Sequence, residues 1–96
     1  FADGDGIYID ANGATFDGNR VQDGSNDGIF VAPLATNTEL RKNIVRNNLG
    51  EGFDIASSPA VFKGNVALGN RIDLGFSVWF DTSGNVIGTF NAPDVP

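Results

Sequence analysis

Carboxylates recur at one place in the sequence, directly before a glycine that starts a short apolar stretch, at Asp5, Asp27 and Glu51. If these stretches lie side by side, the carboxylates form a column, and like charges at such spacing raise one another's pKa or bind a cation. The chain has no histidine and no cysteine, so an oxygen-only ligand set favours calcium over zinc. The alternative is that these acids are turn residues that hydrogen-bond their own backbone and extend into water.

A second group combines aromatic rings with carboxylates. Alternation along the same apolar stretches places five side chains on the outward side of the expected strands: Tyr8, Asp10, Phe30, Asp54 and Trp79. Ring faces beside carboxylates that accept hydroxyl groups are typical of a carbohydrate platform. Exposed aromatic residues equally mark a protein contact, and Trp79 with Phe80 could instead fold over the last repeat as a cap. The sequence leaves these interpretations open.

Acid–base catalysis would need two carboxylates at a working distance, and Asp10 with Asp54 is the outward pair. These residues lie two repeats apart, about 9.6 Å at the spacing of stacked strands. That separation suits an inverting pair poorly and a retaining pair hardly at all. The absence of cysteine and histidine also excludes thiol nucleophiles and imidazole bases. The sequence therefore favours a protein without catalytic residues.

The element that must position these residues is a repeat of about 23 residues. Glycines that stand 22, 24 and 23 residues apart (28 − 6, 52 − 28 and 75 − 52) each start an alternating apolar segment. They are Gly6, Gly28, Gly52 and Gly75. A second block recurs between them, at residues 14–19, 38–43 and 60–65. Short alternating runs separated by Gly, Asn and Asp predict strands and turns, and units of this size bury their apolar side only by parallel stacking.

Alternation also selects the interior side chains. On the first strand of each repeat they are Ile7 and Ile9, Ile29 and Val31, Phe53 and Ile55, and Phe76 and Val78. On the second strand they are Ala14 and Phe16, Thr38 and Leu40, and Ala60 and Phe62. The side chains suited to a third strand are Val21, Val45 and Ala67.

Asn19, Asn43 and Asn65 fall at equivalent positions after the second strand. Stacked amides can donate to one neighbour and accept from the other, so we predict an asparagine ladder at a tight turn. Contact of these amides with a glycan or a metal is the alternative. A glycine precedes the first and third of these asparagines, whereas Lys42 precedes the second, so the middle repeat is expected to turn differently there.

The glycine-apolar strand, the turn and the apolar-x-Gly-Asn turn resemble the right-handed parallel β-helix repeat family, the pectate-lyase-like superfold, over about residues 5–90. The resemblance implies an all-β fold, a right-handed parallel β-helix (β-solenoid) of about four coils with a period of 22–25 residues. Residues 1–80 are expected to form four coils, and residues 81–96 a partial final coil and C-terminal tail. Family members include polysaccharide lyases, hydrolases and epimerases as well as surface and structural proteins, and no catalytic motif of the family occurs in this chain. The resemblance also implies an extracellular or cell-surface location.

Charge limits the partners. Twelve acidic against six basic residues give a net charge of −6, which disfavours nucleic acid and anionic membranes. No 18-residue apolar run is present, so we expect no membrane insertion. The basic residues cluster at four positions: Arg41, Lys42, Arg46 and Lys63. This cluster could form a strip that binds polyanions, but a cross-strand ion pair between Asp17 and Arg41 is the favoured interpretation.

Four coils would leave the interior apolar side chains of the first and last coils (the apolar rungs) uncovered on one side. The unpaired edge of a parallel sheet is also a template for further strands. The sequence therefore favours a structural or assembly module that packs against a protein partner or copies of itself. The alternative is a fragment of a carbohydrate-binding or polysaccharide-active β-helix. Because the chain starts at Phe1 rather than methionine, we expect a processed product or a segment of a longer protein.

Overall fold

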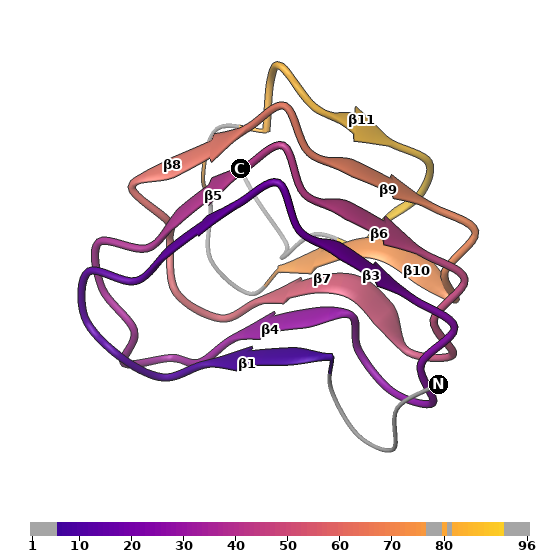
Figure 1. Ribbon diagram of the computed structural model, residues 1–96, viewed down its shortest axis with the longest axis horizontal. Helices are drawn as coiled ribbons and strands as arrows, with labels where there is room; N and C mark the ends of the chain where they lie inside the picture. The colour runs from indigo at the N-terminus through magenta and orange to yellow at the C-terminus, as the bar shows by residue number, and fades with distance from the viewer. Residues whose placement is uncertain (1–5, 77–79, 81, 92–96) are drawn as a thin grey trace.

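The computed structural model describes residues 6–76, 80 and 82–91, with the side chains of residues 90 and 91 excepted, and short strands follow one another along them (Figure 1). The strands of the first two coils are β1 (Ile7–Ile9), β2 (Thr15–Asp17), β3 (Arg20–Gln22), β4 (Ile29–Val31), β5 (Glu39–Arg41) and β6 (Ile44–Arg46). Those of the later coils are β7 (Glu51–Ile55), β8 (Val61–Lys63), β9 (Val66–Leu68), β10 (Ile72–Phe76), β11 (Val86–Ile87) and β12 (Phe90–Asn91).

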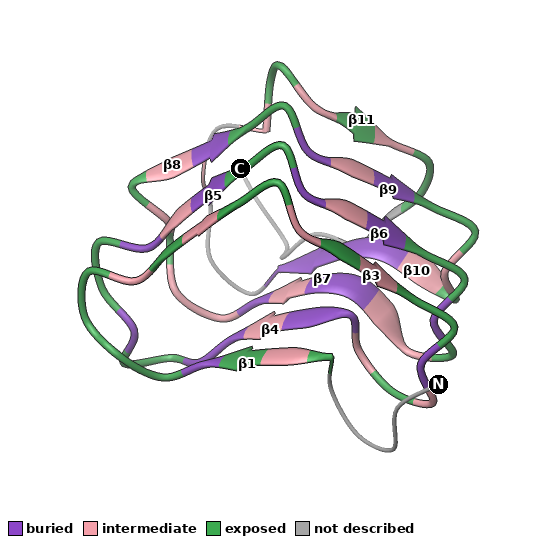
Figure 2. Ribbon diagram, in the orientation of Figure 1, coloured by how far each residue is buried: buried purple, intermediate pink, exposed green. Residues whose placement is uncertain are grey.

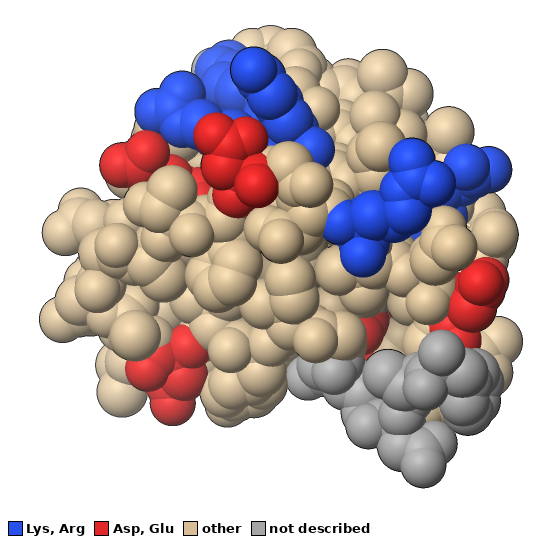
Figure 3. Space-filling model, viewed as in Figure 1, with Lys and Arg blue, Asp and Glu red and all other residues tan. Residues whose placement is uncertain are grey.

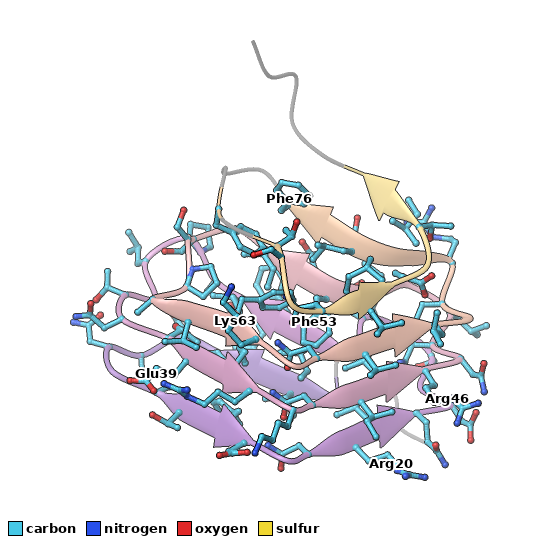
Figure 4. The ribbon with its side chains drawn as sticks, turned by 90° about the horizontal axis from the view of Figure 1, so that it is seen from above. Arg20, Glu39, Arg46, Phe53, Lys63 and Phe76 are labelled. Carbon is cyan, nitrogen blue, oxygen red and sulfur yellow. The ribbon has the colours of Figure 1, made fainter. Side chains whose placement is uncertain are left out.

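Each strand pairs in parallel with its counterpart one coil away, and three sheets result. The first sheet has the strand order β1-β4-β7-β10-β12, the second β2-β5-β8 and the third β3-β6-β9-β11. The chain is therefore an all-β, parallel β-solenoid of about four turns, as predicted, and Figure 4 shows the coils stacked as layers. The described residues contain no helix of the length and apolarity that a membrane crossing requires.

The interior consists of columns of apolar side chains, one from each coil, as the alternation predicts. Ile29 stacks between Ile7 and Phe53, and Val45 between Val21 and Ala67, in the predicted registers. Figure 2 shows burial concentrated in the middle coils, and Figure 4 shows Phe53 inside the stack. One assignment was wrong, because Ala60 is exposed one residue before β8 begins.

The fourth coil pairs in a register two residues away from the predicted one. Leu74 lies beside Phe53, Phe76 beside Ile55 and Gly75 beside Asp54, whereas the glycine repeat placed Gly75 beside Gly52. A shift of two residues keeps every side chain on its own face, so Phe76 is buried as predicted but next to a different partner. The predicted interior position of Val78 lies outside the described residues.

The predicted asparagine ladder is present. The backbone N–H and side-chain Nδ2 of Asn19 both donate to Asn43 Oδ1, at 3.0 and 3.1 Å, and Asn43 donates to Asn65 Oδ1 in the same way. Asn65 in turn donates to Asn85, which extends the ladder to the fourth coil. The expected different turn at Lys42 was wrong: Lys42 adopts a φ of 55°, in the left-handed region that the glycines of the other coils occupy, because the ladder bonds on both sides hold the turn in place.

A second ladder, which was not predicted from the sequence, lies directly after β3, β6 and β9. The N–H of Gly24 donates to Asn48 Oδ1, and the N–H of Asn48 donates to Asn70 Oδ1. The ladder ends at the buried carboxylate of Asp73, whose Oδ1 accepts from the backbone N–H and Nδ2 of Asn70 at 2.9 and 2.8 Å. Oδ2 of Asp73 accepts from the backbone and hydroxyl of Thr89, so one buried side chain ties two coils together.

Phe80 lies over the last apolar rung. Its ring makes edge contacts with Phe62 and Phe76, each with a centroid distance of 5.2 Å. This contact agrees with the predicted cap at the end of the repeats, although Trp79, the other residue named for it, lies outside the described residues.

Candidate functional site

The strand glycines control which side the carboxylates face. In the second coil Asp27 and Phe30 are partly exposed, whereas Gly28 and Ile29 between them are buried. Two buried residues in succession break the alternation, because the chain bends at the glycine toward the third sheet, where any side chain at Gly28 would overlap Val45. The residue before the glycine and the residue two after it therefore both face outward.

The same bend at Gly52 brings Glu51 and Asp54 to one side, and a cluster of three carboxylates forms with Asp27. An oxygen of each carboxylate lies within 4.8 Å of the others. The N–H of Glu51 donates to Asp27 Oδ1 at 2.8 Å, which positions Asp27 against the next coil. The carboxylate of Glu51 extends over Gly75, where a Cβ would overlap it. The glycine thus leaves room for the third acid of the cluster.

Two aromatic rings continue the same outward face. Tyr8 and Phe30 lie side by side with ring centroids 5.1 Å apart and an angle of 34° between their planes. Phe30 is also the register partner of Asp54, so the rings lead directly to the carboxylates. Tyr8 is 60% exposed, which makes it the accessible part of this pair. The outer face of the first sheet therefore combines an aromatic surface with acids.

Asp27 is the acid whose ionisation the cluster alters. Partial burial, followed by a hydrogen bond to the Asp54 side chain, raises the pKa of Asp27 from 3.8 to about 6. The charge of Asp54 acts in the same direction, while the Glu51 N–H and the charge of Arg71 oppose the shift. Below about pH 6 Asp27 therefore keeps its proton, and the protonated carboxyl group can donate a hydrogen bond.

The cluster also offers the ligand chemistry of a divalent cation. Three carboxylates supply oxygen donors only, which suits calcium, and backbone oxygens or water would have to complete its six to eight ligands. The described surface has no enclosed pocket around these residues. Any ligand of this face would consequently bind to an open surface.

The structure brings together some of the carboxylates that the sequence grouped, but not all of them. Asp27 and Glu51 do lie together as neighbours in one column, but Asp5 lies outside the described residues. Asp54 joins them, although the sequence analysis grouped it with Asp10. Asp10 follows β1, and the equivalent positions of the next two coils are occupied by Ala32 and Ala56 rather than by a carboxylate. The signal that could have found this grouping is the glycine between the acids, because it marks the bend.

The predicted ion pair between Asp17 and Arg41 was wrong. The two residues are register partners in β2 and β5, but the guanidinium of Arg41 lies 3.2 Å from Glu39 of its own strand. Alternate residues of one strand face the same side, so Glu39 lies within reach of the long Arg41 side chain. The pair is exposed and contributes little to stability.

The raised pKa of Asp27 predicts a pH dependence of stability. Since the folded protein keeps a proton that the unfolded chain releases, this contribution is complete below pH 3.8 and is lost as the pH rises through about 6. Solvent screening at this half-buried group limits the expected difference to about 1 kcal/mol. Urea unfolding of wild type and Asp27→Asn between pH 4 and 7 measures it. A constant difference between the two proteins over that range would contradict the assignment.

Comparison with known proteins bears on the whole chain. A family model described as "right handed beta helix region" matches residues 1–91. Neither the curated proteins nor the solved structures contain a match.

Proposed function

Because the chain belongs to the right-handed β-helix family, we propose that it is a structural module of an extracellular or cell-surface assembly, whose first coil packs against a further coil. The open apolar rung of that coil carries the proposal. Ile29, Leu40 and Val45, the interior residues of the second coil, are 0% exposed. Their counterparts in the first coil remain partly exposed.

The first coil contributes Ile7, Phe16 and Val21 to the interior columns. Each of these side chains is covered on one side by the second coil and remains partly exposed on the other. Figure 3 shows the molecule from this end, and the middle of the face carries no charged side chain. Covering the rung with one more coil would remove apolar surface from water, the main driving force of association.

Backbone groups at the same end point in the direction that a further coil would occupy. The residues that flank β3 bond to the second coil, because Asn19 O accepts from Ile44 N–H and Asp23 N–H donates to Arg46 O. Alternate residues of a parallel strand direct both backbone groups to the same neighbour, so those of Arg20 and Gln22 face the open end. Such an edge is a template for strand pairing.

Replacing Arg20 by proline tests this proposal. The change removes an N–H from the open edge and no bond to the second coil, so folding is expected to persist while association is lost. The matched control is Ile44→Pro, which removes the 2.8 Å bond from Ile44 N–H to Asn19 O and is expected to destabilise the fold. Sedimentation velocity over a range of concentrations is the measurement. A wild-type chain that stays monomeric at high concentration, and binds no dye for exposed apolar surface, would refute the proposal.

A second candidate function is carbohydrate binding on the outer face of the first sheet, with calcium held by the carboxylate cluster. The adjacency of the Tyr8–Phe30 ring pair to Asp54 favours it. Ring faces pack on the C–H face of a sugar while carboxylates accept its hydroxyl groups. Below about pH 6 the protonated carboxyl group of Asp27 adds a hydrogen-bond donor to that surface.

This candidate predicts that Tyr8→Ala weakens binding of neutral oligosaccharides about tenfold, the effect of losing an exposed aromatic contact of roughly 1.4 kcal/mol. The melting temperature should stay unchanged, since Tyr8 contributes to no interior column. The matched control is Leu34→Ala, which removes another exposed apolar side chain, in the turn after β4. Glycan-array binding, with and without calcium, is the measurement. Equal binding by the two variants would count against a carbohydrate platform.

A further inference from the structure

The outward face of the third sheet is apolar in the later coils, whereas the outward positions of the second sheet are mostly polar. Four outward side chains make up this apolar patch: Ile44, Val66, Leu68 and Val86. Ile44, Val66 and Val86 are successive register partners, so they form one column with a spacing of about 4.8 Å. Leu68 lies two residues after Val66 and therefore on the same side of the sheet. The four side chains are thus neighbours on one surface.

Solvent reaches this apolar patch. Val86 is 57% exposed and Leu68 is 40% exposed, while Ile44 and Val66 are partly exposed. All four strands of the third sheet lie within the described residues. Contiguous apolar side chains with a polar rim are typical of a surface that binds another molecule.

Two cations form the rim of the patch. The strands of the third sheet contain Arg20 and Arg46 and no acidic residue, and the acid next in sequence, Asp23, lies in the turn after β3. Arg20 continues the column of Ile44, and Arg46 is the register partner of Leu68. Both arginines are exposed, and Figure 4 shows them at the periphery of the stack. Figure 3 shows a group of basic side chains over the same sheet.

The first sheet carries the opposite charge. Its strands contain three acids, Glu51, Asp54 and Asp73, and no basic residue. Asp73 is buried, whereas Glu51 and Asp54 lie on the outward side, next to the ring pair of Tyr8 and Phe30. This face therefore combines apolar surface with negative charge, where the third sheet combines apolar surface with positive charge.

From this complementarity we infer that the outward face of the third sheet binds the outward face of the first sheet of a second copy of this chain. Two β-sheets pack face to face at about 10 Å, with the side chains of both faces between them. The aliphatic patch would lie against the Tyr8–Phe30 ring pair, and the two arginines would face the carboxylates. The contact joins the sides of the coils and leaves the apolar rung of the first coil free, so it is independent of the end packing proposed above.

Contacts between like faces lack this match. Two third-sheet faces would bring arginines together, and two first-sheet faces would bring carboxylates together, which like-charge repulsion disfavours. Each copy has one face of either kind. A contact between unlike faces does not close on itself, so it adds further copies on both sides rather than giving a fixed dimer.

Charge exchange between the two faces is the experiment that tests this inference. Arg46→Glu and Asp54→Lys each place like charges opposite one another, so each variant alone is expected to associate about tenfold more weakly than wild type. An equimolar mixture of the two variants again has opposite charges wherever unlike molecules meet, and its association is expected to be restored. Sedimentation velocity of the variants and their mixture, at one total concentration, is the measurement.

The control for the charge change is Lys63→Glu, which makes the same reversal on the second sheet and should leave association unchanged. Melting temperatures check that all variants fold. Arg46 is exposed, and a lysine in place of Asp54 would lie beside the carboxylates of Asp27 and Glu51, so folding is expected to persist.

The apolar part of the contact has its own variant. Val86→Ser removes an exposed side chain from the patch and should weaken association about tenfold, whereas Leu34→Ser, in the turn after β4, should not.

The outcomes separate this contact from end packing. Unchanged association of Arg46→Glu, Asp54→Lys and Val86→Ser would overturn the inference and leave the proposed function standing. A mixture that associates no better than its components would overturn the pairing of unlike faces. A wild-type chain that stays monomeric would overturn it as well.

Discussion

Replacing Asn43 by alanine is expected to lower the free energy of unfolding by about 4 kcal/mol, because it leaves several buried polar groups without partners. Asn43 is fully buried, at 0% exposure. Its Oδ1 accepts two bonds from Asn19, and its Nδ2 donates to Phe16 O and Asn65 Oδ1. Alanine has no polar side-chain atom with which to replace these bonds. Water cannot replace them either, since the side chain lies fully buried between Asn19 and Asn65.

Urea unfolding followed by far-ultraviolet circular dichroism measures this loss. The control is Asn26→Ala, an exposed asparagine in the loop before β4, for which a change below about 0.5 kcal/mol is expected. Asn19 supplies a graded comparison. Among the described residues its amide has a ladder neighbour on one side only, so its loss should cost less. If Asn43→Ala unfolds at the same urea concentration as Asn26→Ala, the ladder is not a source of stability.

Replacing Asp73 by alanine is the second large effect, with an expected loss of about 3 to 5 kcal/mol. The buried carboxylate accepts four hydrogen bonds, two from Asn70 and two from Thr89. All four donors lose their acceptor at once. Because these bonds join the end of the second ladder to the segment before β12, the last coil should open more than the rest of the chain.

Asp73→Asn distinguishes the hydrogen bonds from the shape of the side chain. Its amide keeps one oxygen acceptor for Asn70 but turns a nitrogen donor toward the Thr89 N–H, so a loss between those of wild type and Asp73→Ala is expected. Native-state hydrogen exchange at the amides of Asn70 and Thr89 locates the effect. Equal protection of these amides in wild type and Asp73→Ala would contradict the role assigned to Asp73.

The predictable part of this fold came from residues whose effect is local. Ile29 and Val31 alternate on a strand, and the same alternation recurs in each coil, so the interior columns could be read from spacing. The asparagine at the turn was predictable for the same reason, since an amide stacks on its own copy whatever surrounds it. A repeat turns a local preference into a global arrangement, because each coil's neighbour has the same sequence pattern.

The candidate site could be predicted only in part. Asp27 and Glu51 were paired correctly, because both precede a strand glycine. Asp54 was assigned to a different group, because strict alternation puts residues three apart on opposite faces. The bend at Gly52 reverses that rule for Glu51 and Asp54. It depends on close contact with Asn70, which lies after β9.

By itself, then, the sequence determined a parallel solenoid of about four coils, its interior side chains and its first asparagine ladder, all consequences of period and alternation. Only the tertiary structure decided the register of the fourth coil, where Leu74 rather than Phe76 stacks on Phe53, and the second ladder that ends at Asp73. The physical reason is that a shift of two residues preserves the buried face, so alternation cannot distinguish the two registers. Contacts between coils, including the bonds that Asp73 makes with Thr89, favour one of them.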